Sequence, residues 1–582
     1  MKRILVYIVV LVATVACNAV DVDGDPSPDG KDSASGMITE IISGRQVATK
    51  ATINDETAAF AWTVGDNIAV HVSNTNGSHK YVTTADTGAS GASATAAEAS
   101  FTVVYDAGYS RDAFAVYPSY IVDRDAEYYG QTVGESHAKL DVTLPATYTL
   151  AQVSGETSPC PMIASNSNTD SNWEFYQLCG LLRLKVYSIP PSTNRLEINF
   201  NGKQVCGSFS IASPVTPRTS VIATTTLTDE SDTRDIISII PNGNAETLNG
   251  NQWLDEQVLN IPLPVVSTDE VADRYKDITI TAYNAGGEAL LSMTRPFNYK
   301  ATREYGAKRI ASLPVFSISG DKRVVFAPGN LQAKYTKSSN TWEWLFATNQ
   351  YDYVGNDSGN IMINGNGTLS ADGTVDLFGM STSINFYGIT DSSSTDGTYV
   401  DWGTIGTFKH KTVTTTYSSD YWFTLSEGEW KYVVGEDWPR RKNGGTVAGV
   451  SDAHCTKATV NGINGFILFP DHYFSDGTAE AVTWEASFIG NDSMGNSGTD
   501  GWGATITLTS WTTLEKEGCV FFPAAGEMSA GSTTVNNPGT FGSYKHRNSI
   551  SYLRFNDDGF DPNEIGFTKA SRRSVRLVHE IN

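Results

Sequence analysis

The chain is poor in cysteine and in basic residues, and each shortage excludes a class of protein. Its 582 residues include 6 cysteines, and none of these stands in the CxxC or CxxH spacing of zinc and redox sites. A disulfide scaffold and a zinc centre are therefore excluded. Lys and Arg number 41 against 64 Asp and Glu, which gives a formal net charge of −23. A chain this acidic lacks the basic footprint that nucleic-acid phosphates require, so no nucleic-acid partner is expected.

Recognisable catalytic motifs are also missing. The sequence contains no GxSxG, no HExxH and no phosphate-binding loop. Glycosidases need two carboxylates at a fixed separation around the scissile bond. No such pair of acidic residues stands out from the background of this chain. We therefore predict a non-enzymatic protein with no catalytic residues, and a surface hydrolase is the weakest of the alternatives.

What the chain does contain is the composition of a β-rich protein. Aromatic residues make up 11% of it, and glycine occurs 52 times. Short segments of alternating apolar and polar residues recur between turns, notably at 101–105, 181–187 and 278–283. This pattern is typical of β-sandwiches rather than of βαβ units. We expect a mainly β fold, and the length of the chain suggests three or four domains.

The first 36 residues predict export and attachment to a membrane by lipid. A positively charged start precedes an apolar run over 4–12, which has the length of a secretory signal. The tract Thr14-Val15-Ala16-Cys17 resembles a bacterial lipobox. This implies a signal peptide over 1–17, lipidation of Cys17 and an outer-membrane lipoprotein at the cell surface. The alternative is an ordinary signal peptide cut just before the cysteine. Residues 18–36 are acidic and rich in Pro, Gly and Ser, which predicts a flexible tether.

Residues 37–170 and 171–314 are predicted to form two successive β-sandwiches. Three tracts in order carry a resemblance to a known family: 62–70 (WTVGDNIAV), 114–120 (FAVYPSY) and 175–184 (FYQLCGLLRL). They resemble the fimbrillin-like lipoproteins of Bacteroidales over roughly residues 37–314. The resemblance implies two tandem fimbrillin-type β-sandwiches, used as a pilus building block or as the stem of a surface adhesin.

The same resemblance implies a way to meet partners. Members of the family can polymerise when a protease cuts after a basic residue and frees a groove for a strand of a neighbouring subunit. In physical terms this is β-augmentation, in which main-chain hydrogen bonds supply the affinity. Arg45, which follows the apolar segment 38–42, is the candidate cleavage site. The alternative is that Arg45 is an exposed arginine before the first strand.

The composition changes near residue 315, because 9 of the 12 tryptophans lie in 316–582. Three of the tracts that characterise this region are 344–352 (WLFATNQYD), 423–430 (FTLSEGEW) and 574–578 (SVRLV). They resemble the C-type-lectin-like modules that share an outline with formylglycine-generating enzymes. The resemblance implies an α+β domain over 315–582 and transfers no activity. Ser426 and Glu429 predict a capping box at the start of a helix.

Several residues of this last region are candidates for binding a ligand. An oxygen-rich cluster could supply calcium ligands, and the alternative is a solvated loop; it consists of Asn556, Asp557, Asp558, Asp561, Asn563 and Glu564. Trp402 and Trp502 are candidate platforms for a glycan, and the alternative is that they belong to the core. Two further tracts were considered, Asp471-His472-Tyr473 at the end of a strand and the basic Tyr544-Lys545-His546-Arg547.

Together these observations predict a surface-anchored fimbrial or adhesin-type lipoprotein whose C-terminal head binds a glycan or a surface protein. The expected partners are other fimbrial subunits, reached by strand exchange, and the ligand of the head. No cofactor other than Ca²⁺ is expected. The alternative function is a glycan-binding outer-membrane lipoprotein that serves a polysaccharide-uptake system without assembling into a pilus.

Overall fold

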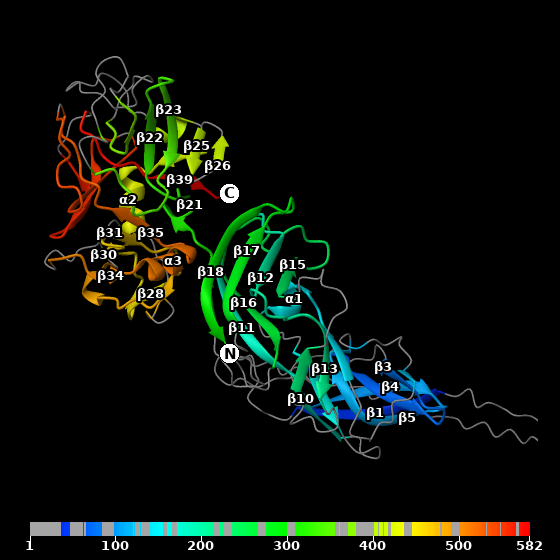
Figure 1. The fold of residues 1–582 in the computed structure, drawn as a ribbon. Coiled ribbons are helices and arrows are strands. Elements are labelled where there is room, and N and C mark those ends of the chain that lie inside the picture. Colours follow the sequence, from blue (N-terminus) through cyan, green and yellow to red (C-terminus); the bar gives the residue numbers. More distant parts are fainter. Residues whose placement is uncertain are drawn as a thin grey trace, which may run out of the picture.

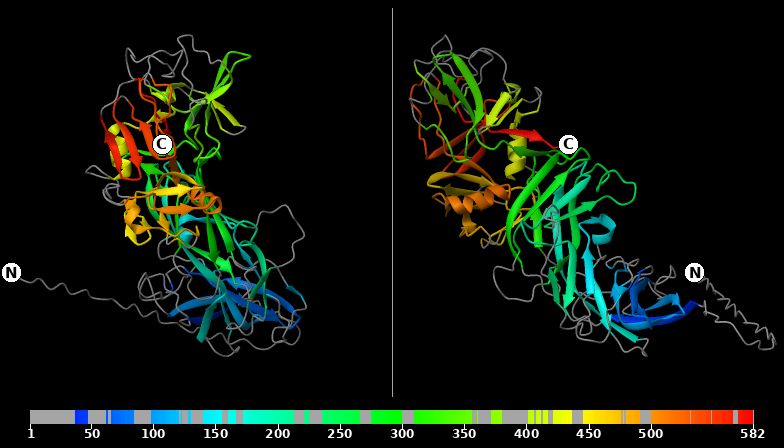
Figure 2. Two further views of the ribbon diagram at one scale, coloured as in Figure 1. Left: turned by 60° about the vertical axis from the view of Figure 1, so that its left-hand side comes forward. Right: turned by 45° about the vertical axis from the view of Figure 1, so that its right-hand side comes forward.

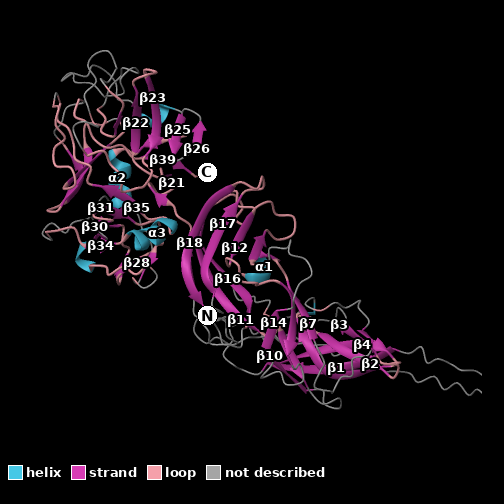
Figure 3. Cartoon of the chain, viewed as in Figure 1, coloured by secondary structure: helices cyan, strands magenta, loops and turns pink. Residues whose placement is uncertain are grey.

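The structure is a computed structural model, and it describes the greater part of residues 37–581 (Figure 1). The described residues are 37–46, 62, 66–83, 98–119, 122, 128–129, 140–154, 160–165, 172–212, 221–224, 235–265, 275–299, 309–355, 360, 371–379, 401–405, 407–410, 413–416, 421–435, 445–475, 477, 480–490, 500–530, 532–547, 549–565 and 570–581. Three β-rich units follow one another along an elongated molecule, and Figure 2 shows the same succession from two other directions. Strands dominate all three units (Figure 3), which confirms the mainly β fold.

The first unit is built around one eight-stranded sheet. Its strands are β1 (Met37–Gln46), β2 (Ala69–Asn74), β3 (Ser78–Thr83), β4 (Glu98–Asp106), β5 (Tyr109–Tyr117), β6 (Tyr128–Tyr129), β9 (Met162–Ser165) and β10 (Asn172–Gln177). Their order in the sheet is β4-β1-β10-β9-β5-β2-β3-β6. Side chains of β4 and β2 share one core around Trp62 although several strands separate them in this order. The sheet must therefore curve round that core.

A small second sheet faces the first across another core. It contains β7 (Leu140–Leu144), β13 (Gly207–Ala212) and β14 (Val221–Thr224), in the order β14-β13-β7. Phe209 of β13 and Leu144 of β7 pack with Val116 and Ile163 of the large sheet. The first unit thus consists of two packed sheets, as expected for a sandwich.

The second unit is a two-sheet sandwich with a continuous apolar core. One sheet contains β8 (Thr147–Thr149), β12 (Arg195–Asn199), β15 (Ile236–Ile240), β17 (Tyr275–Tyr283) and β18 (Ala289–Tyr299), in the order β18-β17-β12-β15-β8. The other contains β11 (Cys179–Ile189), β16 (Leu254–Pro264) and β19 (Arg309–Ser312), in the order β16-β11-β19. Alternate residues such as Ile198 and Ile280 point into the core from one sheet, and Leu184 and Ile261 do so from the other.

Strand pairing joins the first two units more closely than a boundary at residue 170 would suggest. β10 follows that boundary yet pairs with β9 and β1 of the first unit. β8 precedes the boundary yet pairs in parallel with β15 of the second. β11 begins in the core of the first unit at Cys179 and Leu181 and continues into that of the second at Leu184. The short helix α1 (Leu150–Val153) lies between β8 and β9.

The third unit, which we call the head, combines several small sheets with two helices. Its strands are β20 (Phe316–Ser317), β21 (Arg323–Phe326), β22 (Leu331–Thr336), β23 (Thr341–Phe346), β24 (Gly373–Val375), β25 (Thr407–His410), β26 (Val413–Thr416), β27 (Phe423–Thr424), β28 (Thr446–Val447), β29 (Val450–Ser451), β30 (Cys455–Val460), β31 (Ile463–Leu468), β32 (Phe474–Ser475), β33 (Ile489–Gly490), β34 (Ala504–Ile506), β35 (Val520–Pro523), β36 (Phe541–Lys545), β37 (Tyr552–Asn556), β38 (Phe560–Glu564) and β39 (Leu577–Glu580). The helices are α2 (Glu427–Val434), α3 (Leu508–Lys516) and the 3₁₀ turns η3 (Trp402–Ile405) and η4 (Ala486–Phe488).

The predicted capping box is present at the start of α2. The Ser426 backbone N–H donates to the Glu429 carboxylate at 2.7 Å, and the Glu429 N–H donates to the Ser426 hydroxyl at 3.4 Å. Trp430, Val433 and Val434 form the buried face of the helix, as the sequence predicts. The closing strand β39 pairs with β21 on one side and β27 on the other, so it lies inside its sheet of the head.

The head is fixed to the second sandwich by side chains from both units. Arg323 of β21 forms an ion pair with Asp255 and lies over the ring of Trp253, with 4.5 Å between the guanidinium carbon and the ring centroid. Ile581 belongs to the core of the sandwich although it follows β39 of the head. Helix α3 packs against β18. No helix among the described residues is long and apolar enough to cross a membrane.

Candidate functional site

Strand β1, which contains the predicted cleavage site, lies inside the large sheet rather than at its edge. It pairs antiparallel with β4 in nine register positions, from Met37 opposite Asp106 to Arg45 opposite Glu98. On its other side it pairs in parallel with β10, from Ser43 opposite Asn172 to Gln46 opposite Phe175. Arg45 therefore stands one residue before the end of a strand that has a neighbour on each side. The alternative of an arginine preceding the first strand is wrong, because β1 is that strand.

Main-chain hydrogen bonds hold β1 between its two neighbours. Removal of residues 37–45 would expose one backbone edge on β4 and another on β10, and the two edges would line a slot one strand wide. Adjacent strands in a sheet lie about 4.8 Å apart, so such a slot fits one further extended chain. The geometry of β1 is thus that of a strand which another strand of the same direction could replace.

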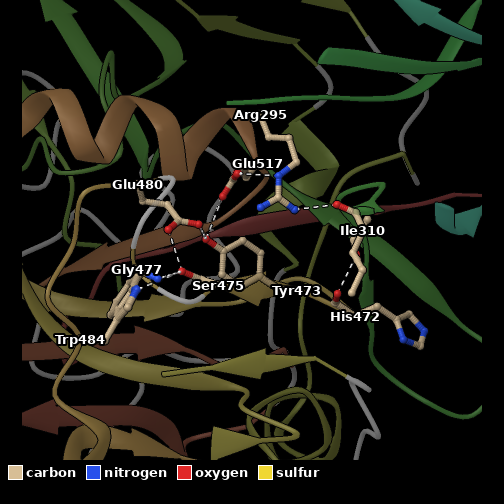
Figure 4. Close-up of polar contacts among 10 residues, drawn as sticks. Arg295, Ile310, His472, Tyr473, Ser475, Gly477, Glu480, Trp484 and Glu517 are labelled. Atoms are coloured by element: carbon tan, nitrogen blue, oxygen red, sulfur yellow. Dashed lines mark hydrogen bonds and ion pairs between the residues drawn. The ribbon is translucent and has the colours of Figure 1, made fainter. Parts of the chain in front are cut away.

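A second constellation, entirely of side chains, lies where the head meets the second sandwich (Figure 4). Arg295 of β18 forms an ion pair with Glu517, whose Oε1 lies 3.4 Å from the guanidinium Nε. The other carboxylate oxygen of Glu517 lies 2.9 Å from the Tyr473 hydroxyl, and that hydroxyl lies 3.1 Å from Glu480 Oε1. Glu480, Glu517 and Tyr473 are all at most 3% exposed.

Further hydrogen bonds extend this network on both sides (Figure 4). Ser475 Oγ donates to Glu480 Oε2 at 2.7 Å and accepts from the Gly477 N–H and from Trp484 Nε1. On the sandwich side, Arg295 donates to the Ile310 carbonyl at 2.7 Å. The residues come from four separate parts of the chain, and the network therefore joins the head to both sheets of the sandwich.

The tract Asp471-His472-Tyr473 belongs to the contact between the head and the second sandwich, which we call the joint, rather than to a ligand site. Asp471 accepts from the backbone N–H and the hydroxyl of Ser317, at 3.1 and 2.6 Å. The His472 ring stacks on Tyr187 of β11 with 4.5 Å between ring centroids. The His472 carbonyl accepts from the Ser312 hydroxyl at 2.7 Å. His472 thus fastens the head to the sandwich directly, whereas the Asp471 side chain bonds to Ser317 of the head's own strand β20. The backbone N–H of Asp471 does reach the sandwich, because it donates at 2.8 Å to the carbonyl of Val315, a residue of the sandwich core.

The electrostatics of the joint follow from its burial. Burial raises the pKa of Glu517; the Arg295 guanidinium opposes this rise and the nearby carboxylate of Glu480 adds to it, and together they bring the pKa to about 8. Burial also raises the pKa of the Cys519 thiol well above its ordinary value, so this cysteine is not an activated thiol. Two buried carboxyl groups this close resemble a catalytic pair, but both are closed off from any substrate.

The structure separates the residues that were predicted to bind a ligand. Trp402 is 1% exposed and packs against Phe378, so its ring offers no face to a glycan and belongs to the core. Trp502 is partly buried against Phe555. Asp557 and Asp558 are exposed in the turn between β37 and β38. Trp502 and this turn lie together, since the Gly501 N–H donates to the Asp557 carbonyl at 3.2 Å.

A buried lysine lies beside these aspartates. The ammonium of Lys457, a residue that is 3% exposed, donates to the Asp557 carbonyl at 2.7 Å. Burial lowers the pKa of Lys457, and the nearby charges of Asp557, Asp500 and Asp558 oppose this shift. In the part of the chain that the structure describes, no group of three or more His, Cys, Asp or Glu residues could hold a metal ion.

Most of the other side chains of the predicted calcium cluster have partners within the protein. Asn556 Oδ1 accepts from the Gly559 backbone N–H at 2.8 Å, and Asp561 accepts from the Asn563 backbone N–H at 2.8 Å. Glu564 pairs with Arg554 at 3.1 Å, whereas the buried Oδ1 atom of Asn563 has no hydrogen-bond partner among the described residues. Asp561, Asn563 and Glu564 lie in strand β38 rather than in a solvated loop, and calcium binding stays a prediction.

Two other predicted features have different outcomes. The tract 544–547 does not form a basic surface patch, because Tyr544, Lys545 and His546 are buried and Arg547 pairs with Glu429. Cys17 and the tether over 18–36 lie outside the described residues.

Sequence reasoning missed the partners of Tyr473. Glu480, Glu517 and Arg295 are distant from one another in the chain, and none of them stands in a motif. Glu517 does follow an amphipathic segment that ends in Lys516, and Glu480 lies between two turns. Neither signal distinguishes them from the other acidic residues of the chain, because only the packing of the head on the sandwich brings them together.

Comparison with known proteins finds resemblance only among solved structures. No protein-family profile matches the chain, and no curated protein matches it. A proposed cell adhesion protein from Bacteroides ovatus is 13% identical, with 47% of this chain and 91% of that chain covered and a TM-score of 0.26. The tip fimbrial protein Mfa3 from Porphyromonas gingivalis, truncated at its C-terminus, is also 13% identical, with 48% and 94% covered and a TM-score of 0.19. A fimbrial assembly protein from Parabacteroides distasonis is 11% identical, with 53% and 99% covered and a TM-score of 0.22. TM-scores this low do not assign a fold to the chain.

Proposed function

We propose that this chain is a non-enzymatic fimbrial or adhesin-type subunit that is anchored at the cell surface and carries a ligand-binding head. The observation that carries the proposal is the position of β1. A strand that lies inside a sheet, ends beside Arg45 and is bonded to β4 and β10 through its main chain can be exchanged for a strand of a neighbouring subunit. Lipidation of Cys17 would hold the subunit at the outer membrane until this exchange occurs.

Strand exchange explains why the residue at the cleavage site lies so close to the end of β1. Cleavage after Arg45 would separate residues 37–45 from the rest of the chain while leaving β4 and β10 intact. The freed segment would then be held only by hydrogen bonds and packing. A neighbour's strand could displace it without unfolding the sandwich, because the cores of the first unit contain side chains from at least six other strands.

An arginine-specific protease tests this part of the proposal. Treatment of the purified wild-type protein should yield a chain that begins at Gln46, together with ladders of higher mass on a gel. The Arg45→Lys variant keeps the positive charge but resists the protease, so it should remain monomeric under the same treatment. A wild-type protein that is cut after Arg45 and stays monomeric would refute strand exchange and leave only a binding role.

We further propose that the head binds its ligand, a glycan or a surface protein, on the side that carries Trp502, Asp557 and Asp558. The exposed carboxylates could accept hydrogen bonds from sugar hydroxyls, and the accessible part of the indole could stack on a sugar face. A glycan array read with and without Ca²⁺ tests this idea. Trp502→Ala together with Asp558→Asn should abolish any signal, and Thr505→Ala on the neighbouring strand β34 is a matched exposed control. Unchanged binding by the double variant would place the site elsewhere.

A further inference from the structure

The Tyr473 hydroxyl lies between two buried carboxyl groups, and its hydrogen atom can serve only one of them. The oxygen is 3.1 Å from Glu480 Oε1 and 2.9 Å from Glu517 Oε2. An ionised carboxylate is an acceptor only, and a tyrosine hydroxyl donates one hydrogen bond. If both carboxyl groups were ionised, one of these contacts would set two oxygen lone pairs against each other inside the protein. A second hydrogen atom removes this conflict.

The surrounding donors indicate which carboxyl group carries that hydrogen. Glu480 already accepts from the Ser475 hydroxyl through Oε2, so it is placed to receive the Tyr473 hydrogen through Oε1 as a carboxylate. Glu517 has no such hydroxyl donor besides Tyr473 among the described residues. With a proton on Glu517, Glu517 donates to Tyr473 and Tyr473 donates to Glu480, so no two acceptor oxygens face each other.

Charge balance leads to the same assignment. The groups that face Glu517 are Arg295 from β18, Tyr473 just before β32, Glu480 after β32, and the neutral thiol of Cys519. Arg295 is the only cation in this set. One positive and two negative charges would leave an uncompensated charge in a site that excludes water, whereas a protonated Glu517 leaves a neutral network.

We propose that the joint between the head and the second sandwich is stabilised by a proton held on Glu517, so that the joint weakens as the pH rises and is weakest in alkali. The loss of the proton would place two anions on either side of Tyr473, at the point where α3 meets β18. Other contacts, such as those of Asp471 and His472, would keep the head attached. The inference concerns the joint alone and is independent of the ligand of the head.

The direction of the pH effect follows from the raised pKa of Glu517. Burial raises this pKa to about 8, whereas a glutamate in the unfolded chain titrates near 4.3. Between these two values the folded protein holds a proton that the unfolded chain does not. The stabilising effect of this proton is fully present below pH 4.3 and is lost as the pH rises through about 8.

Two measurements on the full chain test the proposal against Glu517→Gln, whose amide imitates the protonated acid. The first is the number of protons released on unfolding at pH 7. The wild type should release about one proton more than the variant. The second is hydrogen exchange of peptides that cover α3 and β18, corrected for the chemical rate. Protection in the wild type should fall between pH 7 and pH 9, and protection in the variant should not.

Two further variants serve as controls for these measurements. Glu485→Gln changes an exposed glutamate of the same loop region and should behave as the wild type does. Glu480→Gln provides an independent second variant, because its amide can donate to Tyr473 and let Glu517 ionise beside Arg295. This variant should also lose the alkaline step. Equal proton release by the wild type and Glu517→Gln, or the same alkaline loss of protection in both, would overturn the proposal.

Discussion

The first unit and the head hold their parts in different ways. Towards the N-terminus, the sheet of the first unit retains its own strand β1 by main-chain hydrogen bonds to β4 and β10, which any extended chain could make. Towards the C-terminus, the head is retained by particular side chains, among them Arg295, Tyr473 and Glu517. Contacts between main chains permit exchange of one strand for another, whereas a buried polar network accepts only its own residues. The molecule thus holds β1 by contacts that another strand could make, and it holds the head by contacts that depend on particular side chains.

The largest effect should come from a core residue of the head that sequence reasoning assigned to ligand binding. Trp402→Ala should destabilise the head by about 3–5 kcal/mol, because it removes a fully buried indole that packs on Phe378 and Trp344. Urea unfolding followed by tryptophan fluorescence measures this. Trp502→Ala is the control and should cost clearly less. Equal losses from the two would contradict the assignment of Trp402 to the core.

Next in size is a change that breaks the joint directly. Arg295→Met keeps much of the apolar stem but removes the cation that balances the buried Glu480 carboxylate, and it should cost about 3 kcal/mol, the lower end of the range for leaving a buried charge unpaired. The lower end applies because the Arg295 side chain is 16% exposed. The exposed Lys276→Ala on the adjacent strand β17 is the control, expected to change the unfolding midpoint little. A loss of less than 1 kcal/mol in Arg295→Met would show that the network does not hold the head.

His546 should make one contribution to the stability of the head sensitive to acid, and this contribution opposes that of Glu517 over the same pH range. Burial lowers the pKa of His546 to about 3, and an unfolded histidine titrates near 6.5. Stability from the neutral His546 is therefore present above pH 6.5 and is lost as the pH falls towards 3. At pH 5 this should cost the wild type about 2 kcal/mol relative to pH 7.

The variant His546→Asn tests this, since an amide can still donate to Ser551 but takes up no proton. Relative to the wild type, its unfolding free energy should rise by about 2 kcal/mol between pH 7 and pH 5, because the unfolded variant has no histidine at this position to take up a proton. A variant with the full acid dependence of the wild type would assign the effect to other groups. His579, whose pKa burial lowers to about 4, is the next candidate.

The smallest expected effect concerns the cap of α2. Ser426→Ala should cost about 1 kcal/mol, because the Glu429 N–H loses the hydroxyl that it donates to. Ser426→Thr keeps a hydroxyl and should cost little. Thermal unfolding of the two variants separates them. If the alanine and threonine variants unfolded together, the capping box would not contribute to stability.

Sequence reasoning predicted local structure well and long-range contacts poorly. The segment 181–187 lies within β11, and the capping box of α2 is present as predicted, because strand alternation and helix capping are set by neighbouring residues. The burial of Trp402 and the network around Tyr473 both depend on which distant elements pack together. A tryptophan in a core and one on a surface have the same sequence signal, so burial decided between the alternatives at Trp402 and left Trp502 partly accessible.

The boundary between the first two units also depends on contacts between distant residues. Strands β10, β13 and β14 follow the predicted boundary at residue 170 but belong to the first unit, and β8 precedes it but pairs with β15 of the second. Strand pairing is a contact between distant residues, and turn signals along the chain do not encode it. Because strands on one side of the predicted boundary pair with strands on the other, the first two units form one continuous structure. Among the described residues, β1 pairs with β4 and β10 alone.

The most direct test of the central claim is the binding of β1 as a separate peptide. Protein cleaved after Arg45 is separated from its N-terminal fragment and mixed with a synthetic peptide of residues 37–45, and native mass spectrometry counts the bound peptides. If β1 is exchangeable, we expect one bound peptide per chain, loss of the gel ladder while the peptide is present, and no binding of a scrambled peptide. A cleaved protein that neither binds the peptide nor polymerises would show that β1 is a fixed part of the fold and would contradict strand exchange.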